Sequence, residues 1–386
     1  MHLSISILGV GDEISFHQKS VKKPTVFEEA TVHSDRVESN GIFPINRTDS
    51  GTAHVQDSTM KDDYATTIKS LREEFRTNGY VRIPPSVFCL DHDTVASCRQ
   101  AFADLFDGKF ETGIYPDEIH WRKGISREDA TKEICNGWKA NRSVIAKVVC
   151  SKALGKLACA IMEWESCRLG QDDVIDKPPA SALAQAKSPV GFHQDGAYIS
   201  DNFVPLEDNC LTMWMALDDA DKETGALQYA PGSHLWTTKQ QQSINGGIKG
   251  APTTNNAPAA DASSLSFHVA EGDDYMTSLR KAAMDAGVDP TTAVASVVTV
   301  PAATGQLIIH HQNTWHGSGP NTSPTKHRRA LVAHLVRGDV EWNLSSEPQR
   351  PHYIYGRYYL RGERVPRDDF FPFTYTSPTL GDGMTD

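Results

Sequence analysis

The chain has 386 residues, of which 39% are hydrophobic, enough for one large or two ordinary domains with a sizeable buried core. It carries 49 acidic against 38 basic residues, and a formal net charge of -11 would repel the phosphate backbone of a nucleic acid. We therefore expect no nucleic-acid partner.

The seven cysteines are odd in number and form no C-x-x-C pair, which argues against a disulfide framework or a thiolate zinc site. No stretch approaches the length of uninterrupted apolar sequence that a membrane span needs, and the start of the chain lacks the basic residues of a secretory signal. These features predict a cytoplasmic protein with no membrane partner. The sequence carries no indication of its oligomeric state.

Two segments differ in composition from the remainder of the chain. Residues 1–60 are polar and show no sustained period, which predicts a poorly ordered N-terminal extension ahead of a single domain over 61–386. Residues 237–300 form a long insertion with a short amphipathic helix near 275–286. An insertion of this length is expected to be a functional lid or to be disordered.

Helical spacing of apolar residues predicts three helices in the first half of the chain. The first begins at an N-cap at Asp62 and stops at Gly79. The second is capped by Asp91 or Asp93, and a third helical pattern covers about 142–164.

Short β-prone runs bounded by Pro, Gly and Asn predict strands at residues 80–83, 168–175, 190–195, 210–217, 226–230, 305–312 and 328–336. Helices followed by many short strands indicate an α+β fold with an antiparallel sandwich or jelly roll.

The segment VGFHQDGAY contains the first candidate metal ligands. His193 and Asp195 are two apart on a predicted strand, so their side chains point to one face while Gln194 points away. The segment NTWHGSGPN adds His316 at a turn after a strand. Two imidazoles and one carboxylate form the facial triad of non-haem Fe(II) oxygenases, which leaves three positions open for cosubstrate and O2.

An isolated His-x-Asp pair is also frequent by chance, and a histidine on a strand is more often a structural residue. His310 and His311 lie close to His316, and the residues by themselves do not choose among the three.

An oxygenase of this kind that uses 2-oxoglutarate needs a planar cation for the distal carboxylate, for which arginine is well suited. Arg328 and Arg329 stand on the strand predicted after His316. Alternation along a strand lets only one of them face inward.

Three strings of residues resemble the phytanoyl-CoA dioxygenase family of iron and 2-oxoglutarate oxygenases. They are HQD, WMALDDADKETGALQYAPGSH, and HGSGPNTS followed by Arg328. The resemblance runs from about Asp62 to about Val336, interrupted by the insertion. It implies a double-stranded β-helix core, of jelly-roll or cupin-like form, with flanking N-terminal helices. It also implies a dioxygenase that requires Fe(II), 2-oxoglutarate and O2.

Carried over residue by residue, the resemblance implies three iron ligands: His193, Asp195 and His316. It implies that Arg328 pairs with the distal carboxylate of 2-oxoglutarate and that Ser318 contacts the same group. Trp214 would line the cosubstrate pocket and Gln171 would bind 2-oxoglutarate, although both serve equally well as packing residues.

The segment from His316 to Arg328 is one residue longer than the family spacing, which leaves Arg329 as an alternative to Arg328. The order of residues in RRAL favours Arg328. Asp195 disfavours halogenation, because halogenases of this type have Gly or Ala in place of the carboxylate.

The expected reaction is oxidation, by default hydroxylation, of an aliphatic C–H bond in a small molecule, with release of succinate and CO2. An amino acid or a secondary-metabolite intermediate would fit. Tyr198, Phe203 and Arg122 are candidate substrate contacts and are equally surface or packing residues. The alternatives are a cupin-like metal-dependent hydrolase or isomerase and a non-catalytic metal-binding module.

Overall fold

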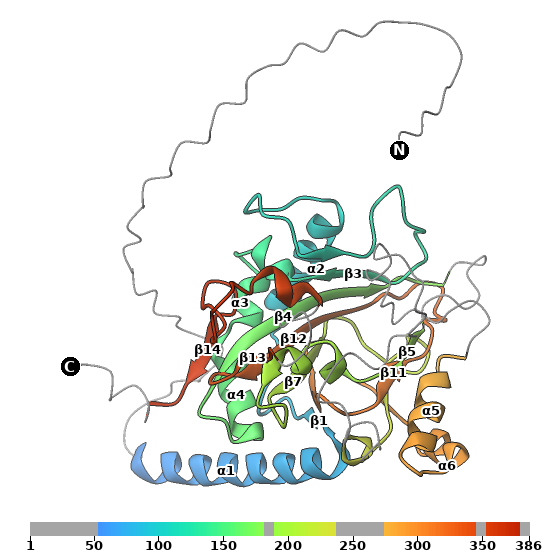
Figure 1. Ribbon diagram of the computed structural model, residues 1–386. Helices are drawn as coiled ribbons and strands as arrows, with labels where there is room; N and C mark the ends of the chain where they lie inside the picture. The colour runs from blue at the N-terminus through green and yellow to red at the C-terminus, as the bar shows by residue number, and fades with distance from the viewer. Residues whose placement is uncertain (1–52, 181–188, 237–273, 345–352, 379–386) are drawn as a thin grey trace, which may run out of the picture. The chain divides into compact units, whose positions relative to one another are not determined.

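The computed structural model describes residues 53–180, 189–236, 274–344 and 353–378 of the chain (Figure 1). Within these ranges, helices are combined with sheets in which every strand pair is antiparallel. No described helix has the length and apolar character that crossing a membrane requires.

The first helix, α1 (Ala53–Asn78), begins earlier than the expected N-cap at Asp62. The reason is that no glycine or proline interrupts the chain between Ala53 and Asp62. The predicted extension therefore overlaps the helix from residue 53 onward, and its earlier part lies outside the described residues. As expected, the helix stops at Gly79, which has a positive φ of 79° and donates its N–H to Phe75 O at 2.7 Å.

Helix α2 (His92–Phe106) begins at the expected aspartate. Asp91 is the N-cap, and its side chain accepts a hydrogen bond from the Thr94 N–H at 2.7 Å.

The third helical pattern is two helices, α3 (Ile145–Val149) and α4 (Lys152–Met162), where one continuous pattern was expected. The break lies at Ser151, whose side chain caps α4 by accepting from the Leu154 N–H. A serine that bonds to the backbone in this way favours a new helix start over continuation of the preceding helix.

The larger sheet has eight strands in the order β1-β10-β7-β12-β4-β3-β2, with β14 also paired to β4. Their bounds are β1 (Tyr80–Ile83), β2 (Glu118–Ile119), β3 (Lys132–Cys135), β4 (Ser166–Lys177), β7 (Cys210–Ala216), β10 (Leu307–His311), β12 (Arg328–Arg337) and β14 (Phe373–Thr376).

The smaller sheet has four strands in the order β5-β11-β8-β9, and β6 pairs with β13 separately. Their bounds are β5 (Val190–His193), β8 (Leu227–Tyr229), β9 (Val298–Val300), β11 (His316–Ser318), β6 (Phe203–Val204) and β13 (Glu341–Trp342). Each of the seven expected runs contains a strand, whereas β2, β3, β6, β9, β11, β13 and β14 were not expected. These unexpected strands are at most four residues long, too short to show a period.

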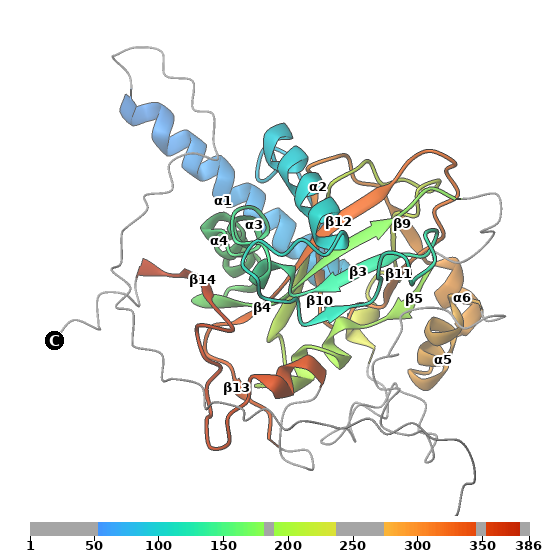
Figure 2. The same cartoon turned by 90° about the horizontal axis from the view of Figure 1, so that it is seen from above.

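Alternation along the central strands separates two apolar layers. On β7, Leu211, Met213 and Met215 pack into the core cluster that α1 to α4 cover, and Figure 2 shows these helices gathered beside the large sheet. Trp214 and Ala216, on the opposite face, belong to a second cluster shared with the smaller sheet. The interior between the two sheets is therefore reached by every second residue of each strand.

The end of the insertion is attached to the smaller sheet. Helix α5 (Thr277–Asp285) confirms the helix expected near 275–286, and α6 (Pro290–Ala295) follows it. The N–H of Phe192 on β5 donates to Tyr275 O at 2.9 Å, next to α5. Residues 237–273 of the insertion lie outside the described residues.

Candidate metal and cosubstrate site

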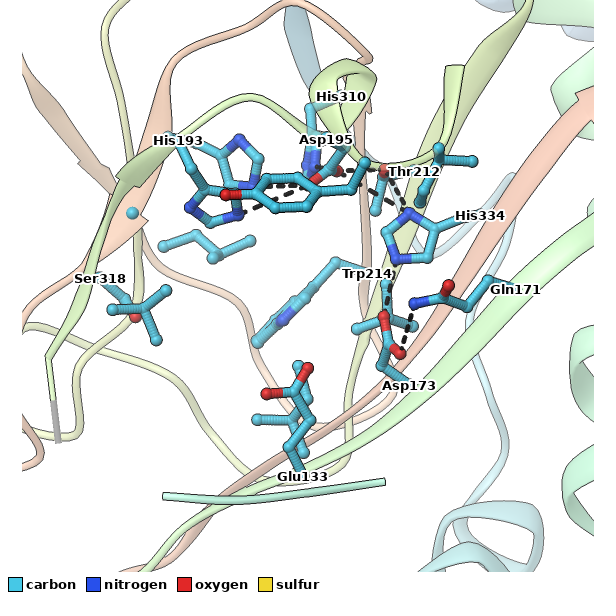
Figure 3. Close-up of a pocket in the computed structure, with 18 of the residues that line it drawn as sticks. Glu133, Gln171, Asp173, His193, Asp195, Thr212, Trp214, His310, Ser318 and His334 are labelled. Atoms are coloured by element: carbon cyan, nitrogen blue, oxygen red, sulfur yellow. Dashed lines mark hydrogen bonds and ion pairs between the residues drawn. The ribbon is translucent and has the colours of Figure 1, made fainter. Parts of the chain in front are cut away.

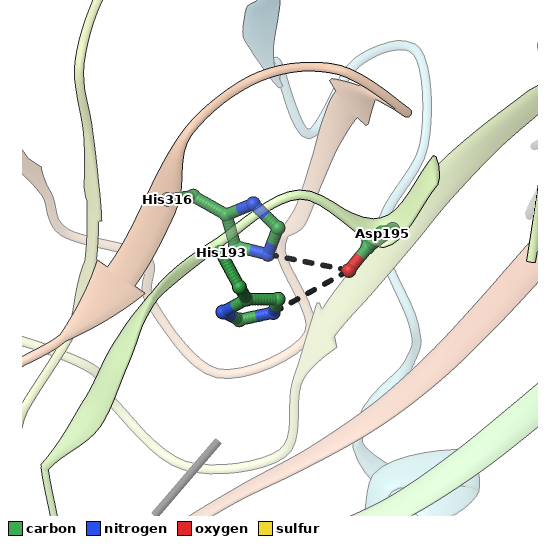
Figure 4. Close-up of side chains that lie close together, drawn as sticks. All are labelled: His193, Asp195 and His316. Atoms are coloured by element: carbon green, nitrogen blue, oxygen red, sulfur yellow. Dashed lines mark ion pairs between the residues drawn. The ribbon is translucent and has the colours of Figure 1, made fainter. Parts of the chain in front are cut away.

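Three side chains converge between the sheets (Figure 4). His193 ends β5, His316 begins β11, and the two are directly opposite in the antiparallel register. The Oδ1 atom of Asp195 lies 3.4 Å from His193 Nε2 and 3.6 Å from His316 Nε2. The three candidate ligand atoms lie within 4.8 Å of one another.

The sequence predicted that both residues of the His-x-Asp pair lie on one strand, and this is wrong. The strand ends at His193, and Asp195 begins a short 3-10 helix (Asp195–Ala197). The turn requires Gly196, whose N–H donates to Gln312 O at 2.8 Å. A Cβ at this position would lie 2.8 Å from the Asn313 side chain. The tight turn, rather than strand alternation, brings the carboxylate to the histidines.

Backbone carbonyls fix the orientation of both imidazoles. His193 Nδ1 lies 2.8 Å from Gly191 O, and His316 Nδ1 lies 2.9 Å from Thr314 O. Each Nδ1 therefore carries the proton, and each Nε2, on the side of Asp195, has a free electron pair. Burial lowers the pKa of His316 well below its usual value, so the ring stays neutral, as a metal ligand must.

The second oxygen of Asp195 is held by the protein. Oδ2 accepts hydrogen bonds from Thr212 Oγ1 at 2.5 Å and from His310 Nε2 at 2.9 Å. Burial raises the pKa of Asp195, but the surrounding imidazoles, among them His310, whose N–H bonds to Oδ2, outweigh it and hold the pKa well below its usual value. The carboxylate is thus ionised and offers one oxygen, Oδ1, to a metal.

The alternatives to His316 have other contacts. His310 faces the interior, where Nε2 bonds to Asp195 and Nδ1 accepts from the Tyr229 hydroxyl at 2.9 Å. His311 faces the other way and bonds to Asp208 Oδ1 at 2.8 Å. The geometry therefore groups His316, and not these two, with His193 and Asp195.

Two neutral imidazoles and one carboxylate, all with fixed orientation, fit Fe(II) in a facial arrangement. The absence of a thiolate among these donors disfavours the sulfur-rich sites typical of structural zinc.

Of the two candidate arginines, Arg328 faces the cavity that the triad also lines. It is 2% exposed, and burial lowers its pKa to about 10. Its Nε has no hydrogen-bond partner among the described residues. Arg329 points away and forms two hydrogen bonds with the Asp218 carboxylate, at 2.7 and 2.8 Å. Arg328 is the cation left for an anionic ligand.

A second buried cation stands beside Arg328. Lys177 on β4 is the register partner of Arg328 on β12 and is fully buried. Its Nζ donates to Ser318 Oγ at 2.6 Å and to Gly319 O at 2.7 Å. Burial, followed by the charge of Arg328, lowers the pKa of Lys177 well below its usual value. The Trp214 ring lines the cavity 5.5 Å from the Arg328 guanidinium carbon.

Gln171 lines the same cavity and is part of a hydrogen-bond chain (Figure 3). Its Nε2 donates to Asp173 Oδ1 at 2.9 Å, and Asp173 Oδ2 lies 2.8 Å from His334 Nε2. His334 Nδ1 lies 2.9 Å from Thr212 Oγ1, which donates to Asp195. Both His334 nitrogens thus donate, so the ring is an imidazolium. Burial lowers its pKa, but the hydrogen bond and charge of Asp173 outweigh this and raise it.

The three candidate substrate contacts lie in different surroundings. Tyr198 lines the cavity. Phe203 is fully buried in an aromatic cluster with Trp342 and Tyr355, outside the cavity. Arg122 is exposed and does not line the cavity. Only Tyr198 is therefore positioned to meet a ligand bound beside the triad.

Sequence reasoning missed several polar residues of this cavity: Glu133, Asp173, Thr212, His310 as a partner of Asp195, His334 and, beneath the cavity wall, Lys177. Alternation along the strands could have found some of them. On β12, Arg328 and His334 are an even number of residues apart and therefore share a face. Because Arg328 was predicted to face inward, His334 could have been predicted to face inward as well.

Two histidines, one carboxylate and a buried arginine around one cavity between antiparallel sheets are the arrangement typical of iron- and 2-oxoglutarate-dependent oxygenases. Within that class, the chain belongs to the phytanoyl-CoA dioxygenase (PhyH) family, whose model matches residues 75–330. This confirms the resemblance and much of its expected extent.

Relatives agree with this family. A probable alpha-ketoglutarate-dependent hypophosphite dioxygenase of Stutzerimonas stutzeri is 26% identical over 172 residues, which cover 45% of this chain and 46% of that protein. This chain thus spans less than half the length of that relative.

Two solved structures share the fold. The epimerase SnoN, in complex with Fe3+, alpha ketoglutarate and nogalamycin RO, is 20% identical with a TM-score of 0.53, covering 80% of this chain and 99% of that chain. The carbocyclase SnoK from nogalamycin biosynthesis is 21% identical with a TM-score of 0.52, covering 79% and 95%.

Proposed function

We propose that the protein is an Fe(II)- and 2-oxoglutarate-dependent dioxygenase. The observation that carries the proposal is that the triad of His193, Asp195 and His316 opens into the same cavity as the unpaired Arg328. The two antiparallel sheets that line this cavity support a double-stranded β-helix, or jelly-roll, core. Residues 61–386 would form this single domain.

The residues at one end of the cavity would bind the metal, and those at the other end would bind the cosubstrate. His193, Asp195 and His316 would hold Fe(II), which supplies O2 activation when it is bound together with 2-oxoglutarate. Thr212 and His310 keep Asp195 ionised and in one orientation by occupying its Oδ2 atom.

Arg328 would bind the distal carboxylate of 2-oxoglutarate. Lys177 adds positive charge there and fixes the Ser318 hydroxyl by donating to it. Two buried cations with no carboxylate hydrogen-bonded to either in the described parts of the chain are costly, and an anionic cosubstrate would offset that cost. Trp214 and Gln171 would line the space between the two ends.

The reaction we propose is oxidation of an aliphatic C–H bond of a small molecule, by default hydroxylation, with release of succinate and CO2. An amino acid or a secondary-metabolite intermediate is the substrate class that we favour, and the names of SnoN and SnoK are compatible with the second. The carboxylate of Asp195 disfavours halogenation because it fills the position that a halide would need.

A cupin-like hydrolase or isomerase is the main alternative, since the same triad can hold Zn(II) and activate water. Such an enzyme has no use for Arg328 and Lys177, which makes the alternative weaker.

The seven cysteines are free thiols, which supports the proposal of a reducing, cytoplasmic compartment.

The test is the visible absorption spectrum of purified protein mixed with Fe(II) and 2-oxoglutarate without oxygen. We expect a weak charge-transfer band from the chelated cosubstrate in the wild type, and release of succinate once oxygen and a substrate are supplied. Asp195→Ala removes a ligand and Arg328→Ala removes the cosubstrate cation, so both variants should lose the band.

Arg329→Ala is the matched control, because this neighbouring arginine pairs with Asp218 and points away from the cavity. It should retain the band. If the wild type binds Fe(II) and shows no band with 2-oxoglutarate, the oxygenase proposal fails and the hydrolase takes its place.

A further inference from the structure

One wall of the cavity is acidic and is formed by residues other than the three proposed iron ligands and Arg328. It is formed by Glu133 and Cys135 of β3 and by Asp173 of β4, of which Figure 3 labels Glu133 and Asp173. Cys135 is the register partner of Asp173, and Glu133 is the register partner of Ile175, so alternate residues of both strands face the cavity.

The two carboxylates of this wall differ in their partners. Asp173 accepts from Gln171 at 2.9 Å and bonds to the His334 imidazolium at 2.8 Å, so its charge is neutralised. No described residue hydrogen-bonds or forms a salt bridge with the Glu133 carboxylate. In Figure 3 it points into the cavity and no dashed line joins it to a neighbour. Glu133 is therefore the carboxylate available to a ligand.

The electrostatic surroundings of Glu133 favour a cation. Burial and, after it, the nearby Asp173 carboxylate raise the pKa of Glu133 to about 7, although His120, His193 and His334 act in the opposite direction. An ionised carboxylate in such a place is costly unless a positive group pairs with it. A bound cation would supply that partner.

The acidic wall and the cosubstrate cations are separated along the sheet. Asp173 pairs in register with Val332 on β12, whereas Lys177 pairs with Arg328 further along the same two strands. The anionic ends of 2-oxoglutarate are thus accounted for by Arg328 and the iron site. Glu133 lines the same cavity as His193 and Asp195, so a group held by Glu133 would share that cavity with the iron ligands.

We propose that the substrate carries a protonated nitrogen, such as an ammonium group, and that Glu133 binds it and thereby presents a neighbouring C–H bond to the iron. This inference rests on the proposed dioxygenase function and specifies its substrate class. Glu133 is a specificity residue, and small anions are poor substrates because the same carboxylate repels them.

A second metal ion is the competing occupant, because Glu133, Cys135 and Asp173 each offer one ligand atom within 4.8 Å of the others. Two observations disfavour it. Burial and the adjacent carboxylates raise the pKa of the Cys135 thiol well above its usual value, whereas a metal needs the thiolate. Asp173 is already committed to His334 and Gln171.

The test is calorimetric titration of the Fe(II) and 2-oxoglutarate complex, without oxygen, with three probes of similar shape: n-butylammonium, 1-butanol and butyrate. We expect n-butylammonium to bind best to the wild type and at least about tenfold more weakly to Glu133→Gln, the loss of one charge-assisted hydrogen bond. Binding of 1-butanol should be the same in both proteins. Glu128→Gln is the control, since this acid stands on the same segment and its side chain is 71% exposed.

Two further measurements make the outcomes distinct. The charge-transfer band of Glu133→Gln should match that of the wild type, which shows that folding and the iron site are intact. The substrate inference is overturned, and the oxygenase proposal stands, if the band forms in the wild type and in Glu133→Gln while n-butylammonium binds equally to the two proteins or to neither. The same holds if butyrate is the probe that binds best. A Zn(II) titration in which the wild type takes up one ion more than Glu133→Gln would overturn it in favour of a metal. Absence of the band in the wild type counts against the oxygenase proposal instead.

Discussion

His316 on β11 lies directly opposite His193 at the end of β5, and the centroids of their rings are 4.3 Å apart. This cross-strand pairing sets the separation of two candidate ligands by sheet geometry, with no loop between them that can shift. Asp195 reaches the same point through a tight turn, and its position therefore depends on the hydrogen bonds that its Oδ2 atom accepts.

Thr212 is the first test of that dependence. Thr212→Val removes the hydroxyl that donates to Asp195 at 2.5 Å while keeping the shape of the side chain. We expect Fe(II) affinity to fall about 10- to 100-fold, the usual cost of losing a residue that orients a ligand. Titration with Fe(II) or Co(II) measures it. Thr212→Ser keeps the hydroxyl and should bind nearly as the wild type does; equal affinity in the Val variant would contradict the orienting role.

His310 and His316 are distinguished by metal titration of two variants. His316→Gln removes a proposed ligand, and we expect no measurable stoichiometric Fe(II) binding. His310→Gln removes the hydrogen bonds to Asp195 Oδ2 and to the Tyr229 hydroxyl but no proposed ligand, and we expect binding that is about 10-fold weaker. The reverse order of effects would make His310 the ligand and refute the assignment.

Lys177 is predicted to strengthen cosubstrate binding from beneath the cavity wall. Lys177→Met removes its charge and the hydrogen bond to Ser318. We expect the 2-oxoglutarate concentration for half-maximal charge-transfer absorbance to rise about 10- to 100-fold, the cost of a charge-assisted hydrogen bond. Arg329→Gln should leave it unchanged. An unaffected Lys177→Met variant would limit the role of Lys177 to packing.

Because Asp172 is buried, we predict that the free energy of unfolding depends on pH. This effect does not involve the metal site. The pKa of Asp172 is raised from 3.8 to about 8, because burial, aided by the nearby Asp173 carboxylate, outweighs the hydrogen bond from the Trp138 N–H, which lowers the pKa. Between about pH 4 and pH 8 the folded protein therefore binds more protons at this group than the unfolded chain does. The free energy of unfolding should fall as pH rises through this range.

Asp172→Asn removes this titration. We expect its melting temperature, relative to that of the wild type, to increase between pH 5 and pH 8, as measured by circular dichroism. Asp285→Asn, at an exposed position, should show no such change. A constant difference between Asp172→Asn and the wild type at both pH values would show that Asp172 titrates normally.

Much of the fold could be predicted because it rests on local patterns. The helix start at Asp91 and the stop at Gly79 depend on single residues that satisfy nearby backbone groups. The seven predicted strands have enough consecutive β-prone residues for their period to show. β3 and β11, with four and three residues, are defined by their neighbours in the sheets, and no local pattern predicts them.

By itself, the sequence determined which residue types the site has, because the His-x-Asp pair, the following histidine and the arginine pair stand in strings typical of the PhyH family. The choice among neighbours required tertiary structure. Adjacent residues on a strand have opposite faces, and only the packing of two sheets decides which face is inside. That packing places Arg328, His310 and His316 in the interior and turns Arg329 and His311 away. It also brings Glu133 beside the triad, a proximity of residues far apart in the chain that no local pattern encodes.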